Sequence, residues 1–192
     1  MNIKEVELDI KKELRASMNG VLSARMREAG MPFKLIFGVE LPRLQNIAGE
    51  FPLDFDLANQ LWQENIRETK LLAIMLMPPE DFTSEIANTW AEKMVTAEEA
   101  QVLAMMLLSK TKQAKEICKA WIEKGNTLQA NCACLCLRHL LMQGEDLRAE
   151  EQVFNRYKEK VQDANLHLRK AIQALTEAFN AKKETQNVED TK

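Results

Sequence analysis

The stretch WAEKMVTAEEAQVLAMMLL, residues 90–108, contains the features from which the architecture of this chain can be inferred. It places Trp90 ahead of an apolar run that holds Ala104, 14 residues further on. Between the two, Thr96 and Glu99 have the spacing of a capping box, in which each side chain binds an exposed backbone N–H of the other residue. The stretch therefore predicts the end of one helix, a short connection and the start of a second, largely buried helix.

The same combination occurs twice more in the chain. Trp62 precedes Ala73 by 11 residues and Trp121 precedes Ala133 by 12, and the three alanines lie 31 and 29 residues apart. A period near 30 residues is typical of stacked helix pairs, in which a large residue fills the groove between units and a small one lets two backbones approach. We therefore predict an all-α fold, an α-solenoid or superhelix of five or six helix pairs.

Composition agrees with a helical globular chain. The 192 residues include 46% hydrophobic and 29% charged residues, with only six glycines and five prolines. This length fits a single domain. We expect one helical-repeat domain over residues 1–182 and a disordered, polar C-terminal tail over residues 183–192.

Apolar periodicity and turn residues give the expected helices. We expect an irregular segment at residues 31–44, after the second helix. The expected helices span residues 4–18, 20–29, 42–48, 54–63, 67–77, 83–93, 96–108, 111–124, 127–142, 147–161 and 164–182.

Charge and hydropathy limit the partners and the compartment. No apolar run reaches the roughly 18 residues of a membrane span, and the charged residues 1–13 do not form a secretory signal, so we expect a cytoplasmic protein without a membrane partner. The net charge of −3 argues against strong nonspecific binding to duplex DNA. A local basic groove remains compatible with this charge, because the field depends on where charges lie.

No metal or other cofactor is expected. Cys132, Cys134 and Cys136 alternate within one predicted helix, so they cannot converge on one tetrahedral metal. With Cys118 they are better explained as buried, reduced hydrophobic residues. The two histidines, His139 and His167, have no ligand partners at suitable spacing.

Two parts of the chain resemble the helical-repeat DNA alkylation repair proteins. Residues 26–34, MREAGMPFK, continuing through Phe37-Gly38-Val39 and residues 41–44, resemble the N-terminal region of that family. Leu61-Trp62, Arg67-Glu68, residues 71–73 and Trp121-Ile122-Glu123 with Asn126 resemble its central repeats. The similarity covers residues 20–180 and implies a superhelix of HEAT-like helix pairs whose concave, basic face holds duplex DNA.

The resemblance also implies an activity. Active members are glycosylases that release alkylated purines, using an aspartate against the developing positive charge, an arginine and two tryptophans. An oxocarbenium-like transition state needs such preorganised negative charge. In this chain the four positions are occupied by residues that cannot play those roles. The matching residues, in chain order, are Ala97, Gln101, Asn131 and Ala174.

The chain is therefore not expected to excise bases in the familiar way, and whether it is an enzyme stays open on sequence alone. Glu98 and Glu99 lie within one turn of Gln101. They are explained as acids that cap the helix and complement its dipole, and the alternative is a shifted catalytic carboxylate.

Basic residues suggest how DNA could be held. Phosphate contacts position a protein on DNA without reading its sequence. The candidate DNA phosphate contacts are Lys34, Arg43, Lys112, Lys115, Arg169 and Lys170. We favour a DNA alkylation repair-like protein that engages duplex DNA on its concave face. The alternative is a scaffold that binds another protein with the same surface, and a solvated face with balancing acids would explain the cations equally well.

Overall fold

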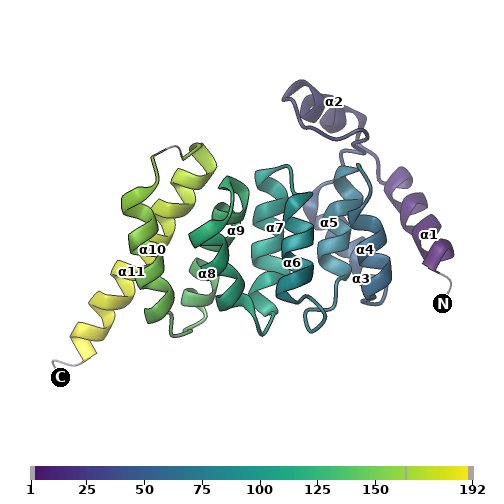
Figure 1. The fold of residues 1–192 in the computed structure, drawn as a ribbon. Helices are drawn as coiled ribbons and strands as arrows, with labels where there is room; N and C mark the ends of the chain where they lie inside the picture. The colour runs from purple at the N-terminus through teal and green to yellow at the C-terminus, as the bar shows by residue number, and fades with distance from the viewer. Residues whose placement is uncertain (1–2, 163, 190–192) are drawn as a thin grey trace. The chain divides into compact units, whose positions relative to one another are not determined.

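A computed structural model describes residues 3–162 and 164–189 of the chain, which falls into two compact units, Met1–Phe82 and Thr83–Lys192 (Figure 1). The helices of unit 1 are α1 (Ile3–Ala16), α2 (Gly20–Glu28), α3 (Leu41–Gly49), α4 (Phe55–Trp62) and α5 (Arg67–Leu76). Those of unit 2 are α6 (Ser84–Glu92), α7 (Ala97–Met106), α8 (Ala114–Lys124), α9 (Thr127–Met142), α10 (Arg148–Lys160) and α11 (Leu166–Glu189), with a 3-10 turn, η1 (Leu108–Lys110), after α7.

The all-α prediction is confirmed. Over the described residues the only extended pairing is an isolated bridge between Leu35 and Ile66. An irregular first part with three helices precedes four regular pairs, α4–α5, α6–α7, α8–α9 and α10–α11. The described residues thus form 11 helices, where five or six pairs including an irregular first unit were expected. The single repeat domain over residues 1–182 remains a prediction.

The tryptophans and alanines occupy the predicted positions in the pairs. Trp62, Trp90 and Trp121 lie on the first helices α4, α6 and α8, and all three are buried. The corresponding alanines lie, equally buried, on the second helices α5, α7 and α9. Trp121 Nε1 donates to Asn88 Oδ1 of α6 at 2.8 Å, so this ring joins two successive first helices, as a groove-filling residue should.

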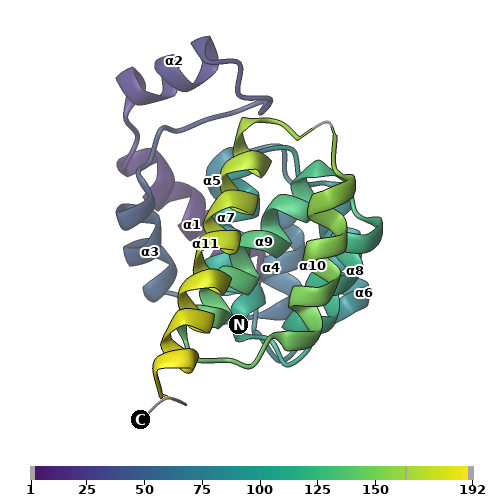
Figure 2. The ribbon, with the colours of Figure 1, turned by 90° about the vertical axis from the view of Figure 1, so that its left-hand side faces the viewer.

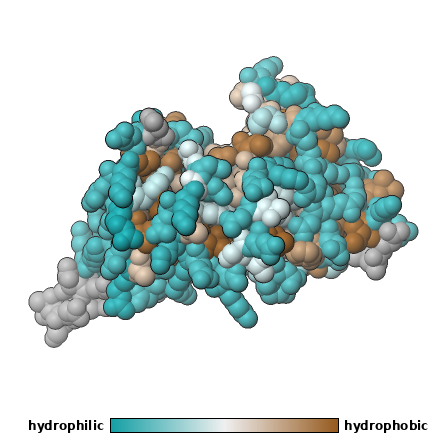
Figure 3. Space-filling model, in the orientation of Figure 1, coloured by the Kyte–Doolittle hydropathy of each residue, from teal (hydrophilic) through white to brown (hydrophobic). Residues whose placement is uncertain are grey.

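Unit 2 is built in two layers, which Figure 2 shows from one end. Helices α7, α9 and α11 form one layer, and α6, α8 and α10 form the other. The side chains over α8 and α10 are mostly hydrophilic on the face shown in Figure 3. We call α7, α9 and α11 the inner layer, because two of them are the second helices that the sequence predicts to be buried.

Residues 31–40 of unit 1 are irregular, as expected, and they are held by one buried ion pair. The Glu68 carboxylate accepts the backbone N–H groups of Phe37 and Gly38, both at 2.9 Å. Arg67 lies 2.8 Å from the same carboxylate and donates to the Val39 carbonyl. In the sequence, Arg67 and Glu68 stand out only through the family resemblance, which gives them no role. The structure shows that these two residues of α5 hold the irregular segment in place.

The last helix is longer than the sequence predicts, and the disordered tail over residues 183–192 remains a prediction. Helix α11 continues to Glu189, past the expected end at Lys182, and residues 190–192 lie outside the described residues. Residues 183–189, KETQNVE, contain neither proline nor glycine, so nothing in them terminates a helix whose preceding turns are already fixed by packing.

The cysteine prediction holds for burial. Cys118, Cys132, Cys134 and Cys136 are all buried free thiols. Burial raises the pKa of Cys134 to about 12 and the pKa of Cys132 well above its ordinary value. These side chains therefore act as small core residues rather than as nucleophiles.

Candidate nucleic-acid interface

The four positions singled out by the family resemblance line one cavity of unit 2. The cavity has a volume of about 390 Å³ and is lined from all three inner-layer helices. Its wall comprises Ala97, Glu98, Gln101, Asn131, Leu135, His167, Lys170, Ala171 and Ala174. Residues 97 and 174 are 77 positions apart in the chain, so their meeting is a result of tertiary structure.

Helical spacing explains which side chains reach the cavity. Ala97 and Gln101 are four apart on α7, as are Asn131 and Leu135 on α9, so each pair shares a face. His167, Lys170, Ala171 and Ala174 follow the same spacing on α11. His167, Leu135 and Ala171 could have been found from this periodicity once Ala174 and Asn131 had been chosen.

Two neutral amides, Gln101 and Asn131, lie in this wall at positions where the family resemblance implies charged groups. Asn131 is 3% exposed and Gln101 is exposed. Among the described residues, neither side chain makes a hydrogen bond. An amide offers donors and acceptors but no net charge, so these two groups can bind polar atoms yet cannot balance a developing cation.

The structure separates the two neighbouring carboxylates. Glu99 is buried and accepts the backbone N–H groups of Val95 at 2.8 Å and Thr96 at 2.7 Å. Thr96 Oγ1 in turn accepts the Glu99 N–H at 3.2 Å, which completes the capping box. Glu98 instead is half-buried in the cavity wall. Of Glu98 and Glu99, only Glu98 could therefore supply a catalytic carboxylate shifted from position 101.

The candidate phosphate contacts of unit 2 are not brought to one surface. Lys170 lines the cavity, whereas Arg169 lines a different hollow between the end of α10 and α11. Lys112 precedes α8 and Lys115 lies on it, in the other layer. The Lys115 ammonium lies 2.7 Å from Glu145, and this hydrogen bond raises the pKa of Lys115.

The two candidate phosphate contacts of unit 1, Arg43 and Lys34, differ in whether other side chains already bind them. Arg43 lies 2.9 Å from Glu13 and 3.8 Å from Glu50, and it also donates to Ser17. Its charge is therefore already balanced within unit 1. Lys34 is exposed, and its side chain makes no ion pair or hydrogen bond among the described residues.

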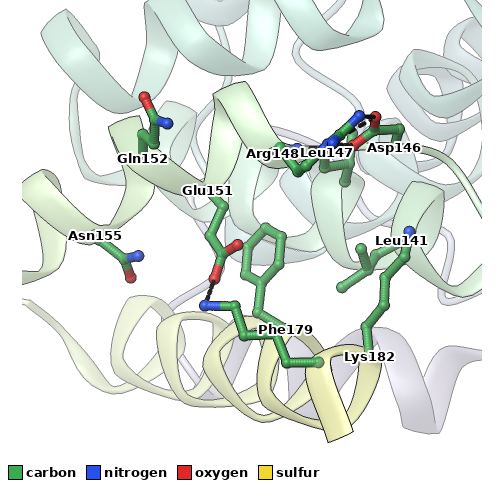
Figure 4. Close-up of a pocket in the computed structure, with 10 residues that line it drawn as sticks. Leu141, Asp146, Leu147, Arg148, Glu151, Gln152, Asn155, Phe179 and Lys182 are labelled. Atoms are coloured by element: carbon green, nitrogen blue, oxygen red, sulfur yellow. Dashed lines mark hydrogen bonds and ion pairs between the residues drawn. The ribbon is translucent and has the colours of Figure 1, made fainter. Parts of the chain in front are cut away.

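A second cavity of unit 2, of about 410 Å³, has most of its charged side chains in ion pairs. The Lys183 ammonium lies 2.6 Å from Glu151. The Arg148 guanidinium lies 2.6 Å from Asp146, and Figure 4 shows this second pair. The Arg148 side chain, by hydrogen bonding, lowers the pKa of Asp146 to about 2. Lys183 and Arg148 are paired with carboxylates, and Lys182 donates to the Glu145 backbone carbonyl. The cavity therefore offers fewer unengaged groups to a charged ligand than the one lined by Lys170.

Within residues 3–162 and 164–189 no group of three His, Cys, Asp or Glu side chains could hold a metal ion. In the same residues, none of the helices combines the length and the apolarity that crossing a bilayer requires.

Paired helices with an inner-layer cavity at the repair-family positions define a HEAT-like helical-repeat protein. The chain belongs to the DNA alkylation repair enzyme family, whose sequence model matches residues 10–187. One solved structure matches with a TM-score of 0.77 and 17% identity, over 93% of this chain and 75% of the other. That protein is described as one of a new family related to the HEAT-like repeat DNA glycosylases with affinity for branched DNA structures. No curated protein sequence matches the chain.

Proposed function

We propose that this protein engages DNA with the inner layer of unit 2 and has lost the familiar base-excision chemistry. One observation carries the proposal. The four positions that match the family's functional residues meet in one cavity, and the position of the acid is occupied there by Gln101. The four positions thus lie together as the family resemblance implies, but the position of the acid carries no negative charge.

The loss of chemistry follows from electrostatics. Releasing a purine builds positive charge on the sugar, and a fixed anion must lie close to it in a site that excludes water. Gln101 cannot supply that anion. Glu98 is three residues away and sits at the positive end of the α7 dipole, which favours its role at the helix N-terminus.

DNA engagement is supported by family membership and by the affinity for branched DNA stated for the structurally similar protein. Lys170 and His167 at the cavity can contact phosphate, and the Asn131 and Gln101 amides can contact sugar or base. A cytoplasmic location belongs to the same proposal, supported by four cysteines that are all free thiols.

A scaffold that binds another protein is the second candidate. It is favoured by the pairing of Arg43 and Lys115 with carboxylates, since paired cations release fewer counterions when they meet phosphate.

Binding of labelled duplex and four-way-junction DNA, followed by fluorescence anisotropy, tests the proposal. We expect binding that weakens steeply between about 50 and about 200 mM salt. Lys170→Gln should lower the salt slope by about 1. Lys119→Gln, on the exposed surface of α8, is the matched control and should leave the slope unchanged.

Excision is tested separately by incubating the protein with methylated DNA and measuring the released base, for which we expect none. Release that disappears in Glu98→Gln would show that a shifted carboxylate does the chemistry and would overturn this half of the proposal. Absence of DNA binding even at low salt would overturn the other half in favour of the protein scaffold.

A further inference from the structure

Helix α2 of unit 1 is held firmly although it contributes little to the core. Of its residues 20–28, all described, only Ser23 is buried. Ser23 Oγ donates to the Ile36 carbonyl at 2.6 Å, and the Asn19 N–H donates to the Phe37 carbonyl at 3.0 Å. The helix therefore lies against the segment that Glu68 fixes, at the edge of unit 1 (Figure 1).

The contact between α2 and this segment depends on a glycine. Gly38 has a φ of 75°, and a Cβ at that position would lie 2.3 Å from the Asn19 carbonyl oxygen. Only glycine permits both this backbone conformation and this approach. The position of α2 is thus specified by this close backbone approach and by the Ser23 hydrogen bond. The side chains of Val21, Arg25, Arg27 and Glu28 remain exposed.

Helix α2 and its flanking residues also carry exposed apolar side chains. Val21 is 66% exposed and Met18, just before the helix, is 60% exposed. Leu35, on the segment that runs back along α2, is 41% exposed. Single exposed apolar residues are ordinary, but these three belong to one short supersecondary element.

The same element concentrates positive charge in a chain whose net charge is −3. Residues 15–34 contain four cations and one carboxylate, which gives a local charge of +3. The side chains of Arg15, Arg25 and Lys34 make no ion pair or hydrogen bond among the described residues. Arg27 donates only to Ser23, within its own helix.

Other cations of unit 1 are engaged by acids. Lys11 lies 2.5 Å from Glu64, Lys12 lies 2.7 Å from Asp9, and Arg43 lies 2.9 Å from Glu13. The unpaired cations are therefore a property of α2 and its flanks, rather than of the unit's surface as a whole. Since the chain turns at Gly30 and Ile36 lies beside Ser23, Lys34 returns alongside the C-terminal half of α2.

We propose that residues 15–35, which we call the α2 platform, form a DNA-binding surface that prefers branched DNA over continuous duplex. Arg15, Arg25 and Lys34 contact phosphates. Met18 and Val21 contact bases that are unstacked where strands separate, as apolar wedges do at distorted base steps. This inference rests on the proposed DNA engagement and adds a surface distinct from the inner-layer cavity.

The test compares two charge-matched double variants of the full chain by anisotropy, on a four-way junction and on a duplex of equal length. Arg25→Gln with Lys34→Gln removes two cations from the platform and should lower the salt slope by about 2 on the junction. Lys124→Gln with Lys160→Gln removes two exposed cations from helix ends of unit 2 and should leave binding unchanged.

A third variant separates apolar contact from charge. Val21→Gln with Met18→Gln keeps the platform charge, and it should bring the affinity ratio of junction to duplex towards 1. Thermal unfolding of each variant at the wild-type midpoint would show that the fold is intact, because none of the four substituted platform residues is buried.

The outcomes are distinguishable. If the variant with Arg25→Gln and Lys34→Gln binds the junction as tightly as the wild type and with the same salt slope, the proposed role of the α2 platform is wrong. The proposed function would still stand. An equal loss in the unit 2 control would also overturn it, since general charge would then explain the binding. A wild-type protein that binds no DNA at low salt would overturn both proposals.

Discussion

At the scale of single residues, Glu68 has the largest structural consequence that the sequence does not reveal. Its carboxylate is fully buried, accepts backbone N–H groups from residues 37 and 38, and faces Arg67. A buried carboxylate is tolerated only when hydrogen bonds and an opposite charge replace its hydration.

Glu68→Gln should lower the free energy of unfolding by about 3 kcal/mol, because the Arg67 charge loses its counter-charge and an amide nitrogen cannot accept an N–H bond. Urea denaturation at pH 7 measures this. Glu50→Gln, which removes an exposed acid 3.8 Å from Arg43, is the control and should cost less than about 1 kcal/mol. Equal effects of the two substitutions would contradict the assigned role of Glu68.

At the scale of elements, the N-terminus of α7 links a local motif to the cavity. The capping box of Thr96 and Glu99 fixes where α7 begins, and Ala97 and Gln101 then project from its first two turns into the cavity wall. A change at the cap therefore acts on both stability and site geometry.

Thr96→Ala should destabilise the protein by about 1 kcal/mol, because the Glu99 N–H loses its acceptor. Thr96→Ser retains a hydroxyl and should recover most of that loss. Chemical denaturation gives the energies, and hydrogen exchange at the backbone amide of residue 99 should be faster in the alanine variant only. Identical exchange in the two variants would argue against the cap as the determinant of this helix start.

At the scale of the whole molecule, the buried thiols connect stability to pH. Burial raises the pKa of Cys134 to about 12, whereas the pKa of an unfolded thiol is about 8.5. Between these values the unfolded state has released a proton that the folded state still binds, so stability falls as pH rises. The contribution is fully present below about pH 8.5.

The free energy of unfolding should therefore decrease from pH 8 to pH 10.5 more steeply in the wild type than in Cys134→Ala. Each such thiol contributes up to about 1.4 kcal/mol per pH unit within this window. Urea titrations across the range measure the difference in slope. Parallel pH dependences would mean that the Cys134 thiol ionises in the folded state.

Net charge is also a property of the whole chain, and here it conceals local differences. The value of −3 argues against strong nonspecific binding. It combines the local charge of +3 on residues 15–34 with acids elsewhere, many of which engage the remaining cations. The proposed DNA engagement would therefore depend on where unpaired cations lie, rather than on their total.

The amino-acid sequence by itself predicted the helix pairs, the buried Trp and Ala positions, the cap of α7 and the burial of the cysteines. These follow from interactions within one or two turns and from a period near 30 residues, both of which are written in local order. Only the tertiary structure brought Gln101, Asn131 and Ala174 to one cavity and placed Lys112 and Lys115 in the other layer. Likewise, only it revealed that Glu68 holds α2 through residues 37 and 38. Such contacts join residues far apart in the chain, and no local spacing specifies which distant helix faces will meet.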